Sequence, residues 1–256
     1  MSGRTTGFGS TSKRWNDHGE EHVRQRPLST ARLATARIRP SEKTMPDRAS
    51  LKFEKSVFIN CPFDEEYYPL LRPLLFTILS FGFNPRIALE SSDSGEQRMT
   101  KICQLIRSAR YAIHDLSRLQ SKKRNEFYRL NMAFELGIEY GIRHLSSTGR
   151  FRTKKCLILG QEKHTFMKAL SDLAGVDIKN HKNDPLILIR QLRSWFIETI
   201  GLTQADSPTV IWYNFNDFMK YCYDEKKSKK FSDEDIRLMP VPEFISSIQN
   251  WLSTNP

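Results

Sequence analysis

Y-A-I-H-D-L-S at 111–117, followed downstream by N-M-A-F-E-L-G at 131–137, is the stretch that decides the fold class. The first segment predicts a short buried strand with the acid Asp115 just past its apolar run. The second predicts the opening turn of a helix that carries a carboxylate, Glu135, among apolar neighbours. In an open α/β sheet, strand carboxyl ends and the amino ends of the following helices converge on one crevice. We therefore expect Asp115 and Glu135 to belong to one polar site.

Short apolar runs alternate with helical patterns on both sides of this stretch. Strands are predicted at 56–61, 85–90, 111–116 and 155–160, with a candidate fifth strand at 176–178. Helical spacing of apolar residues is found at 70–79, 94–109, 131–142, 164–174 and 185–200. Such alternation implies a parallel sheet with right-handed crossovers and helices on both faces. We predict a three-layer, flavodoxin-like α/β domain over residues 52–202.

The two flanks of this domain differ in composition. Residues 1–51 are rich in Gly, Ser, Thr, Arg and Pro without a sustained period, which predicts a disordered basic leader. Met45 is a plausible translation start, so it stays open whether 1–44 is translated. Residues 203–256 predict a helical appendage. Its apolar stripe, made of Phe244, Ile248, Trp251 and Leu252, is expected to pack against the sheet domain or against a second copy.

Charge and cysteine content exclude several classes of protein. The 256 residues carry a net charge of +11, but residues 1–55 alone hold 12 Lys/Arg and 6 Asp/Glu. With no zinc-finger, helix-turn-helix or RNA-binding signature, specific nucleic-acid binding is not expected. No apolar run approaches the roughly 20 residues of a membrane span, and no signal peptide is legible. Four widely spaced cysteines argue against zinc and disulfides, so a cytoplasmic protein is expected.

Polar residues gather where the predicted strands end. Candidates of this kind are Asn60, Asp64, Glu90, His114 and Asp115. One acid at a strand end is ordinary in α/β proteins, whereas several on the same edge indicate a site. His114 is expected to pack or to bond to the backbone rather than to catalyse. Asp115 either caps the following loop or accepts a hydrogen bond from a ribose hydroxyl and tunes Glu135.

Glu135 has two interpretations. Asn131, Glu135, Glu139 and Arg143 recur every four residues, so they could form a solvated face with Glu139 and Arg143 as an ion pair. The same helix is apolar on most other sides, which instead favours burial. A partly desolvated carboxylate at the crevice could act as a nucleophile or stabilise a developing oxocarbenium ion.

The start of the predicted 94–109 helix is a candidate phosphate site. Ser94 and Gly95 lie at the predicted helix start, where free backbone N–H groups could hold a phosphate. Ser94 with Gln97 also matches an ordinary capping box. Arg98 in the first turn could reach a phosphate or lie exposed. No phosphate-binding glycine loop, serine-hydrolase elbow or metal-binding motif is present, and no metal is expected.

Two segments resemble known families. V-F-I-N-C-P-F-D at 57–64 resembles the first strand and loop of Toll/interleukin-1 receptor (TIR) domains. The acid-ended strand at 111–116 with F-E-L-G at 134–137 resembles the Glu-Leu-Gly segment of nucleoside 2-deoxyribosyltransferases. Both families share the flavodoxin-like fold. Both cleave N-glycosidic bonds, of NAD or of deoxynucleosides, through a carboxylate, which in TIR domains sits in a comparable helix.

The resemblance implies roles for the candidate residues. Glu135 would be the catalytic carboxylate and Asp115 would position the sugar. Asn60 and Asp64 would line the base or ribose pocket. The other candidate substrate-binding residues, taken from the sequence itself, are Glu90, Ser94, Gly95, Arg98, His114 and Asn131. The chain departs from both patterns. Asp115 and Glu135 are 20 positions apart, longer than the deoxyribosyltransferase pattern, and the serine- and tryptophan-rich stretch before the TIR glutamate is missing.

The sequence therefore predicts cleavage or transfer at the N-glycosidic bond of NAD or of a nucleoside or nucleotide. No cofactor is required, with NAD as a candidate substrate, and hydrolysis and transfer both stay open. The resemblance further implies a homo-oligomer or partner-activated protein, such as a bacterial antiphage effector. The alternatives are a catalytically silent nucleotide-binding sensor and a TIR-like self-assembly adaptor.

Overall fold

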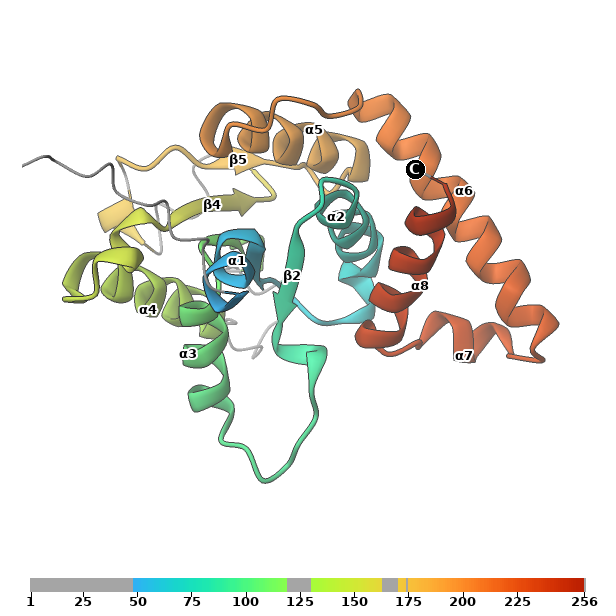
Figure 1. Cartoon of the computed structure of the whole chain (residues 1–256), viewed down its shortest axis with the longest axis horizontal. Helices are drawn as coiled ribbons and strands as arrows, with labels where there is room; N and C mark the ends of the chain where they lie inside the picture. The colour runs from blue at the N-terminus through green and yellow to red at the C-terminus, as the bar shows by residue number, and fades with distance from the viewer. Residues whose placement is uncertain (1–47, 119–129, 163–169, 174, 256) are drawn as a thin grey trace, which may run out of the picture. The chain divides into compact units, whose positions relative to one another are not determined.

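The computed structural model describes residues 48–118, 130–162, 170–173 and 175–255 (Figure 1). The chain divides into two units, Met1–Thr44 and Met45–Pro256, and every described residue belongs to the second. The predicted disordered leader therefore lies almost wholly outside the described residues, as does most of the predicted 164–174 helix. The last residues of the predicted leader are helical, because helix α1 spans Arg48–Lys55.

Among the described residues, five strands form one parallel sheet. They are β1 (Ser56–Asn60), β2 (Asn84–Ile87), β3 (Tyr111–Asp115), β4 (Lys155–Gly160) and β5 (Lys179–Asn180). Their order is β2-β1-β3-β4-β5, the flavodoxin-like order. The predicted α/β fold class is thus confirmed. The fifth strand was predicted too early, at 176–178, where Ile178 is a buried residue just before β5.

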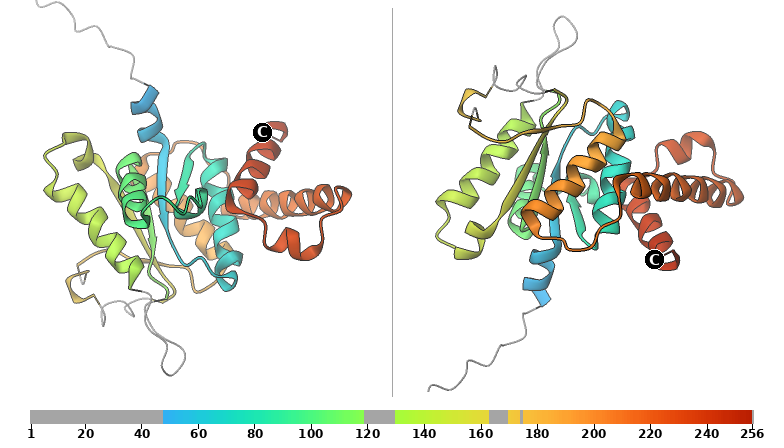
Figure 2. Two further views of the ribbon diagram at one scale, coloured as in Figure 1. Left: turned by 90° about the horizontal axis from the view of Figure 1, so that it is seen from below. Right: turned by 90° about the horizontal axis from the view of Figure 1, so that it is seen from above.

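Two layers of helices cover the sheet (Figure 2). They are α2 (Tyr68–Ser80), α3 (Arg98–Ser108), α4 (Asn131–Leu145) and α5 (Pro185–Trp195), the last continuing as a π-helical turn over Phe196–Ile200. Successive side chains of β1 point to opposite faces of the sheet. Val57 and Ile59 pack with α2 and α5, whereas Phe58 packs with α3 on the opposite face. Burial on both faces explains why the strands read as unbroken apolar runs.

Short elements connect the main ones. They are the 3-10 helices η1 (Glu65–Tyr67), η2 (Ala88–Glu90), η3 (Gly149–Thr153) and η5 (Ser171–Leu173). Gly82 follows α2 with φ of 74°, a left-handed conformation that glycine adopts without strain. This turn lets the chain reverse directly into β2.

The C-terminal residues are helical, as predicted. They form α6 (Pro208–Ser228), α7 (Asp233–Arg237) and α8 (Val241–Thr254). The aromatic ring of Phe76 on α2 lies 5.7 Å from the rings of both Phe218 and Trp251. Phe244 and Ile248 are buried in the same core. The apolar stripe of the tail therefore packs on the sheet domain of its own chain.

No helix in the described ranges combines the length and the apolar character needed to cross a membrane.

Candidate functional site

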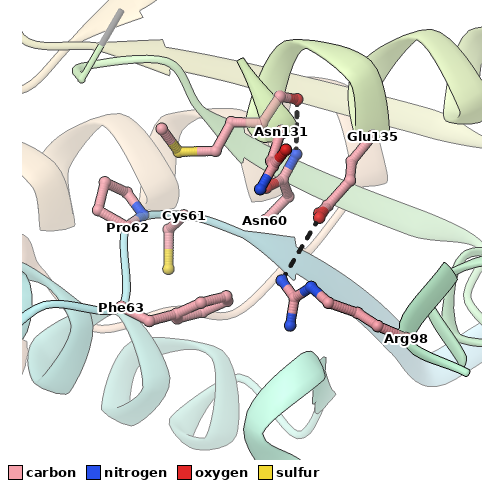
Figure 3. A pocket seen from close by; sticks show the side chains of 8 residues that line it. Asn60, Cys61, Pro62, Phe63, Arg98, Asn131 and Glu135 are labelled. Atoms are coloured by element: carbon pink, nitrogen blue, oxygen red, sulfur yellow. Dashed lines mark hydrogen bonds and ion pairs between the residues drawn. The ribbon is translucent and has the colours of Figure 1, made fainter. Parts of the chain in front are cut away.

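A cavity of about 270 Å³ opens at the carboxyl edge of the sheet (Figure 3). Its lining comes from the end of β1, the first residue of α3 and the start of α4: Asn60, Cys61, Pro62, Phe63, Arg98, Asn131, Met132 and Glu135. Strand order reverses between β1 and β3, and ligands of open α/β sheets bind at such a switch point. The sequence-predicted crevice is therefore present, with four of the predicted residues in it: Asn60, Arg98, Asn131 and Glu135.

Glu135 presents a buried carboxylate to this cavity. Its side chain is 5% exposed, and the Arg98 Nη2 atom lies 3.7 Å from its Oε1 atom. Burial raises the pKa of Glu135 above its ordinary value, and the positive charge of Arg98 partly opposes that rise. Met132 and Leu136, which flank Glu135 on α4, are buried against β4 and hold the helix in place. A desolvated carboxylate is thus fixed at the crevice.

The solvated-face interpretation of this helix is wrong. Glu139, one turn beyond Glu135, is also buried, and its Oε1 atom lies 3.3 Å from the buried Lys154 Nζ. Burial raises the pKa of Glu139 to about 7, against the opposing effect of Lys154. Lys154 Nζ also donates to the Ile106 carbonyl at 2.8 Å. The sequence prediction named Arg143 as the partner of Glu139. Helical spacing could not identify Lys154, because Lys154 lies outside α4, just before β4.

Asn60 and His114 form a polar link between β1 and β3. The two residues are aligned in the parallel register, and Asn60 Nδ2 lies 2.9 Å from His114 Nδ1. Burial, and secondarily the charge of Lys154, lowers the pKa of His114 to about 3, so the ring is neutral at physiological pH. His114 does not line the cavity. It contacts Asn60, and its ring centroid lies 5.8 Å from that of Phe58, so the packing interpretation accounts for its position.

Asp115 lies at the same sheet edge but is fully buried and does not line the cavity. Its carboxylate accepts hydrogen bonds from the Tyr67 hydroxyl and from the Ser117 backbone N–H, the latter at 2.8 Å. His181 Nε2 lies 3.0 Å from Asp115 Oδ2. Although burial opposes ionisation, these contacts with His181, Ser117 and Tyr67 hold the pKa of Asp115 below its ordinary value. The loop-capping interpretation accounts for Asp115. Asp115 and Glu135 therefore do not share one site: Glu135 lines the cavity, whereas Asp115 is buried and bonds to the surrounding protein.

The contact of His181 Nδ1 shows which nitrogen carries the proton in the neutral ring. His181 Nδ1 accepts a hydrogen bond from the Asn183 N–H at 3.0 Å, so in the neutral ring the proton is on Nε2, which faces Asp115. Asp115 thereby ties the end of β3 to Tyr67 after β1 and to His181 after β5. These contacts make the sheet edge that supports the cavity rigid.

The remaining predicted residues lie outside the cavity lining. Asp64 Oδ1 lies 3.2 Å from Arg118 Nη2. Glu90 pairs with Arg86 at 3.0 Å. Ser94 and Gly95 are exposed, and the Gly95 N–H donates to Asp93 Oδ1 at 2.8 Å.

The predicted capping box at Ser94 is wrong. Helix α3 begins at Arg98 with Gln97 as its cap residue, and no side chain caps it. The Ser94–Gly95 turn therefore lies before the helix and is closed by Asp93 rather than by Gln97. A phosphate held by the helix amino terminus through these two residues is not supported by this geometry.

Cys61 lines the cavity and was missed in the sequence. Burial, together with the charges of Asp115 and Glu135, raises the pKa of its thiol well above the ordinary value, so the thiol stays protonated. A protonated thiol is a poor nucleophile, so Cys61 is not a candidate nucleophile of the cavity. His181 was also missed, because the displaced fifth strand concealed it.

Metal ligands do not gather anywhere in the described residues: no group of His, Cys, Asp and Glu there is arranged to hold a metal ion. Comparison with protein-family models, with curated proteins and with solved structures finds no match to the chain.

Proposed function

We propose that this protein cleaves or transfers at the N-glycosidic bond of a nucleoside or nucleotide, NAD included, with Glu135 as the catalytic carboxylate. One observation carries the proposal. A carboxylate with 5% side-chain exposure faces a cavity at the switch point of the sheet, and its cationic neighbour among the described residues, Arg98, is 3.7 Å away. That distance is longer than a hydrogen bond, so the carboxylate retains capacity for a ligand.

The chemistry follows from charge. Breaking the bond from C1′ to the base nitrogen sends the electron pair to the departing base and leaves positive charge on the sugar. A buried carboxylate stabilises that charge strongly, because little water screens it. Glu135 either attacks C1′ to form a glycosyl ester or stabilises the cation until water or an acceptor hydroxyl attacks. Base release is common to both routes.

The size of the cavity favours a nucleoside-sized group. About 270 Å³ lies just below the range of roughly 300–1,000 Å³ common for small-molecule sites. A dinucleotide such as NAD would therefore place one nucleoside inside and the remainder outside. Arg98, whose side chain is 57% exposed, lies at the edge of the lining and suits an anionic phosphate there.

Two competing functions are a catalytically silent nucleotide sensor and a self-assembly adaptor. A catalytically silent nucleotide sensor would use the same cavity, with the Arg98–Glu135 pair serving recognition alone. An adaptor that self-assembles through the C-terminal helices loses support, because the stripe on α8 is covered by α2 and α6 of the same chain.

Base release tests the proposal. The full chain is incubated with NAD and a panel of nucleosides and nucleotides, and free base is measured by chromatography. Glu135→Gln keeps the shape of the side chain but removes its charge, and we expect base release to fall by at least about 100-fold. Glu90→Gln is the matched control, since Glu90 pairs with Arg86 outside the cavity lining. Equal base release by wild type and Glu135→Gln would overturn the proposal.

A further inference from the structure

Asn60 has a defined amide orientation. Its Nδ2 atom lies 2.8 Å from the Met132 carbonyl oxygen and 2.9 Å from His114 Nδ1. A carbonyl oxygen can only accept a hydrogen bond, so the atom facing Met132 must be the amide nitrogen. The second amide hydrogen goes to the neutral His114 ring, whose proton is then on Nε2. Both hydrogens of the Asn60 amide are therefore engaged inside the protein.

This orientation leaves Asn60 as an acceptor toward the cavity. The residue is 1% exposed and lines the cavity, and its Oδ1 atom makes no hydrogen bond to any described residue. An amide oxygen that faces a cavity without a protein donor is satisfied by water or by a ligand that supplies one. Because its nitrogen is occupied, Asn60 offers a hydrogen-bond acceptor and no donor to whatever enters.

Glu135 is a second hydrogen-bond acceptor in the cavity, about one helical turn along α4 from Met132. Met132, which holds the Asn60 amide, precedes Glu135 by three positions on α4, so the two residues share a face of the helix. Figure 3 shows Asn60 and Glu135 on the same side of the cavity. Glu135 and Asn60 thus present two hydrogen-bond acceptors to one cavity.

We propose that Asn60 is a specificity-determining residue that accepts a hydrogen bond from a ribose hydroxyl and thereby favours ribonucleosides over deoxynucleosides. The proposal rests on the proposed function, because Glu135 is taken to mark the position of C1′. A sugar hydroxyl is favoured over a base amine as the donor because Asn60 lines the same cavity as Glu135 and is bonded to Met132, three positions before Glu135 on α4. His114 acts as a positioning residue, since its unprotonated Nδ1 fixes the amide.

The turnover test compares adenosine and nicotinamide riboside with their 2′-deoxy and 3′-deoxy analogues. Intrinsic reactivity differs between these sugars, so the measured quantity is the ratio of kcat/KM for each ribose and deoxy pair, in wild type and in Asn60→Ala. We expect the ratio for one of the two hydroxyls to fall by about tenfold or more in Asn60→Ala. Asn84→Ala is the matched control, since Asn84 is an exposed amide on β2 outside the cavity lining and should leave the ratio unchanged. Identical ratios in wild type and Asn60→Ala would overturn the inference while leaving the glycosidase intact.

A binding test separates this inference from the proposed function. If wild type releases no base from any compound, calorimetric titration of wild type with adenosine, 2′-deoxyadenosine, 3′-deoxyadenosine and inosine decides. Weaker binding of one deoxy analogue, by about fivefold or more, sustains the sugar contact without the chemistry. Equal affinities, no binding at all, or discrimination of inosine alone would overturn it. This comparison needs no variant, so it holds even if Asn60→Ala fails to fold.

Discussion

Arg98 Nη2 lies 3.7 Å from Glu135 Oε1, joining the first residue of α3 to the first turns of α4 across the cavity lining (Figure 3). The side chain of Arg98 is 57% exposed, whereas that of Glu135 is 5% exposed. The cation of the pair is therefore largely open to solvent, whereas the carboxylate is enclosed by the protein.

Removing Arg98 should move the acid limb of the activity profile. Glu135 must be ionised to stabilise a cationic sugar, and burial already raises its pKa while Arg98 opposes that rise. In Arg98→Ala the pKa of Glu135 rises further, so kcat/KM falls at a higher pH than in wild type as the solution is acidified. Arg98→Lys keeps the charge and should retain most of the wild-type profile. An unchanged profile in Arg98→Ala would show that the pair does not tune the carboxylate.

The buried pair of Glu139 and Lys154 should behave as a unit. Lys154→Met leaves a buried carboxyl without its cation, and we expect about 3–5 kcal/mol loss in the free energy of unfolding, measured with urea. Glu139→Leu combined with Lys154→Met removes both charges and should recover most of that loss. Equal losses in the single and double variants would contradict a coupled pair.

Asp115 should make stability depend on pH. Its pKa is below the ordinary value in the folded protein, so its contribution is present above the unfolded pKa of about 4 and is lost as pH falls through the folded value. Asp115→Asn places a donor among the donors of Tyr67, Ser117 and His181 and should cost about 2–3 kcal/mol near neutral pH. Urea unfolding between pH 3 and 7 tests both statements. A variant with the same stability as wild type and the same acid dependence would contradict them.

Phe218 should stabilise the whole unit and not only the C-terminal helices. Its ring is fully buried, 5.7 Å from that of Phe76 on α2 and 5.6 Å from that of Phe244 on α8. Phe218→Ala should cost about 3–5 kcal/mol and lower the midpoint of a single unfolding transition. Tyr213→Ala, on an exposed part of α6, is the control. Two separate transitions in wild type would show that the C-terminal helices fold independently.

The sequence predicted the sheet better than the network around it. Lys155–Gly160 was placed without error because it contains the uninterrupted apolar run 156–159 and lies on an interior strand of the sheet. The fifth strand has only two residues, Lys179 and Asn180, and no apolar period marks it. Its displacement hid His181, whose contact with Asp115 joins residues 66 positions apart and follows from tertiary packing alone.

Cavity residues were predicted from the sequence where the pattern that marks them lies within a single helix or strand. Glu135 was identified from an acid within an apolar helix, a local pattern that burial explains. Asp115 was given a place beside the substrate, yet three donors from separate segments enclose it. Ser94 matched a capping box by spacing, but Asp93 closed the turn before the helix began. Spacing alone does not show which of two neighbouring polar residues satisfies a backbone group.

Chemical rescue of Glu135→Ala tests the central claim most directly. Removing the carboxylate should reduce base release by at least about 100-fold, and added sodium formate or azide should restore it at least about tenfold by entering the vacated space. Azide should also be recovered bonded to C1′ of the sugar, identified by mass spectrometry. Base release by Glu135→Ala at the wild-type rate, or no release by wild type from any nucleoside, nucleotide or NAD, would contradict the account.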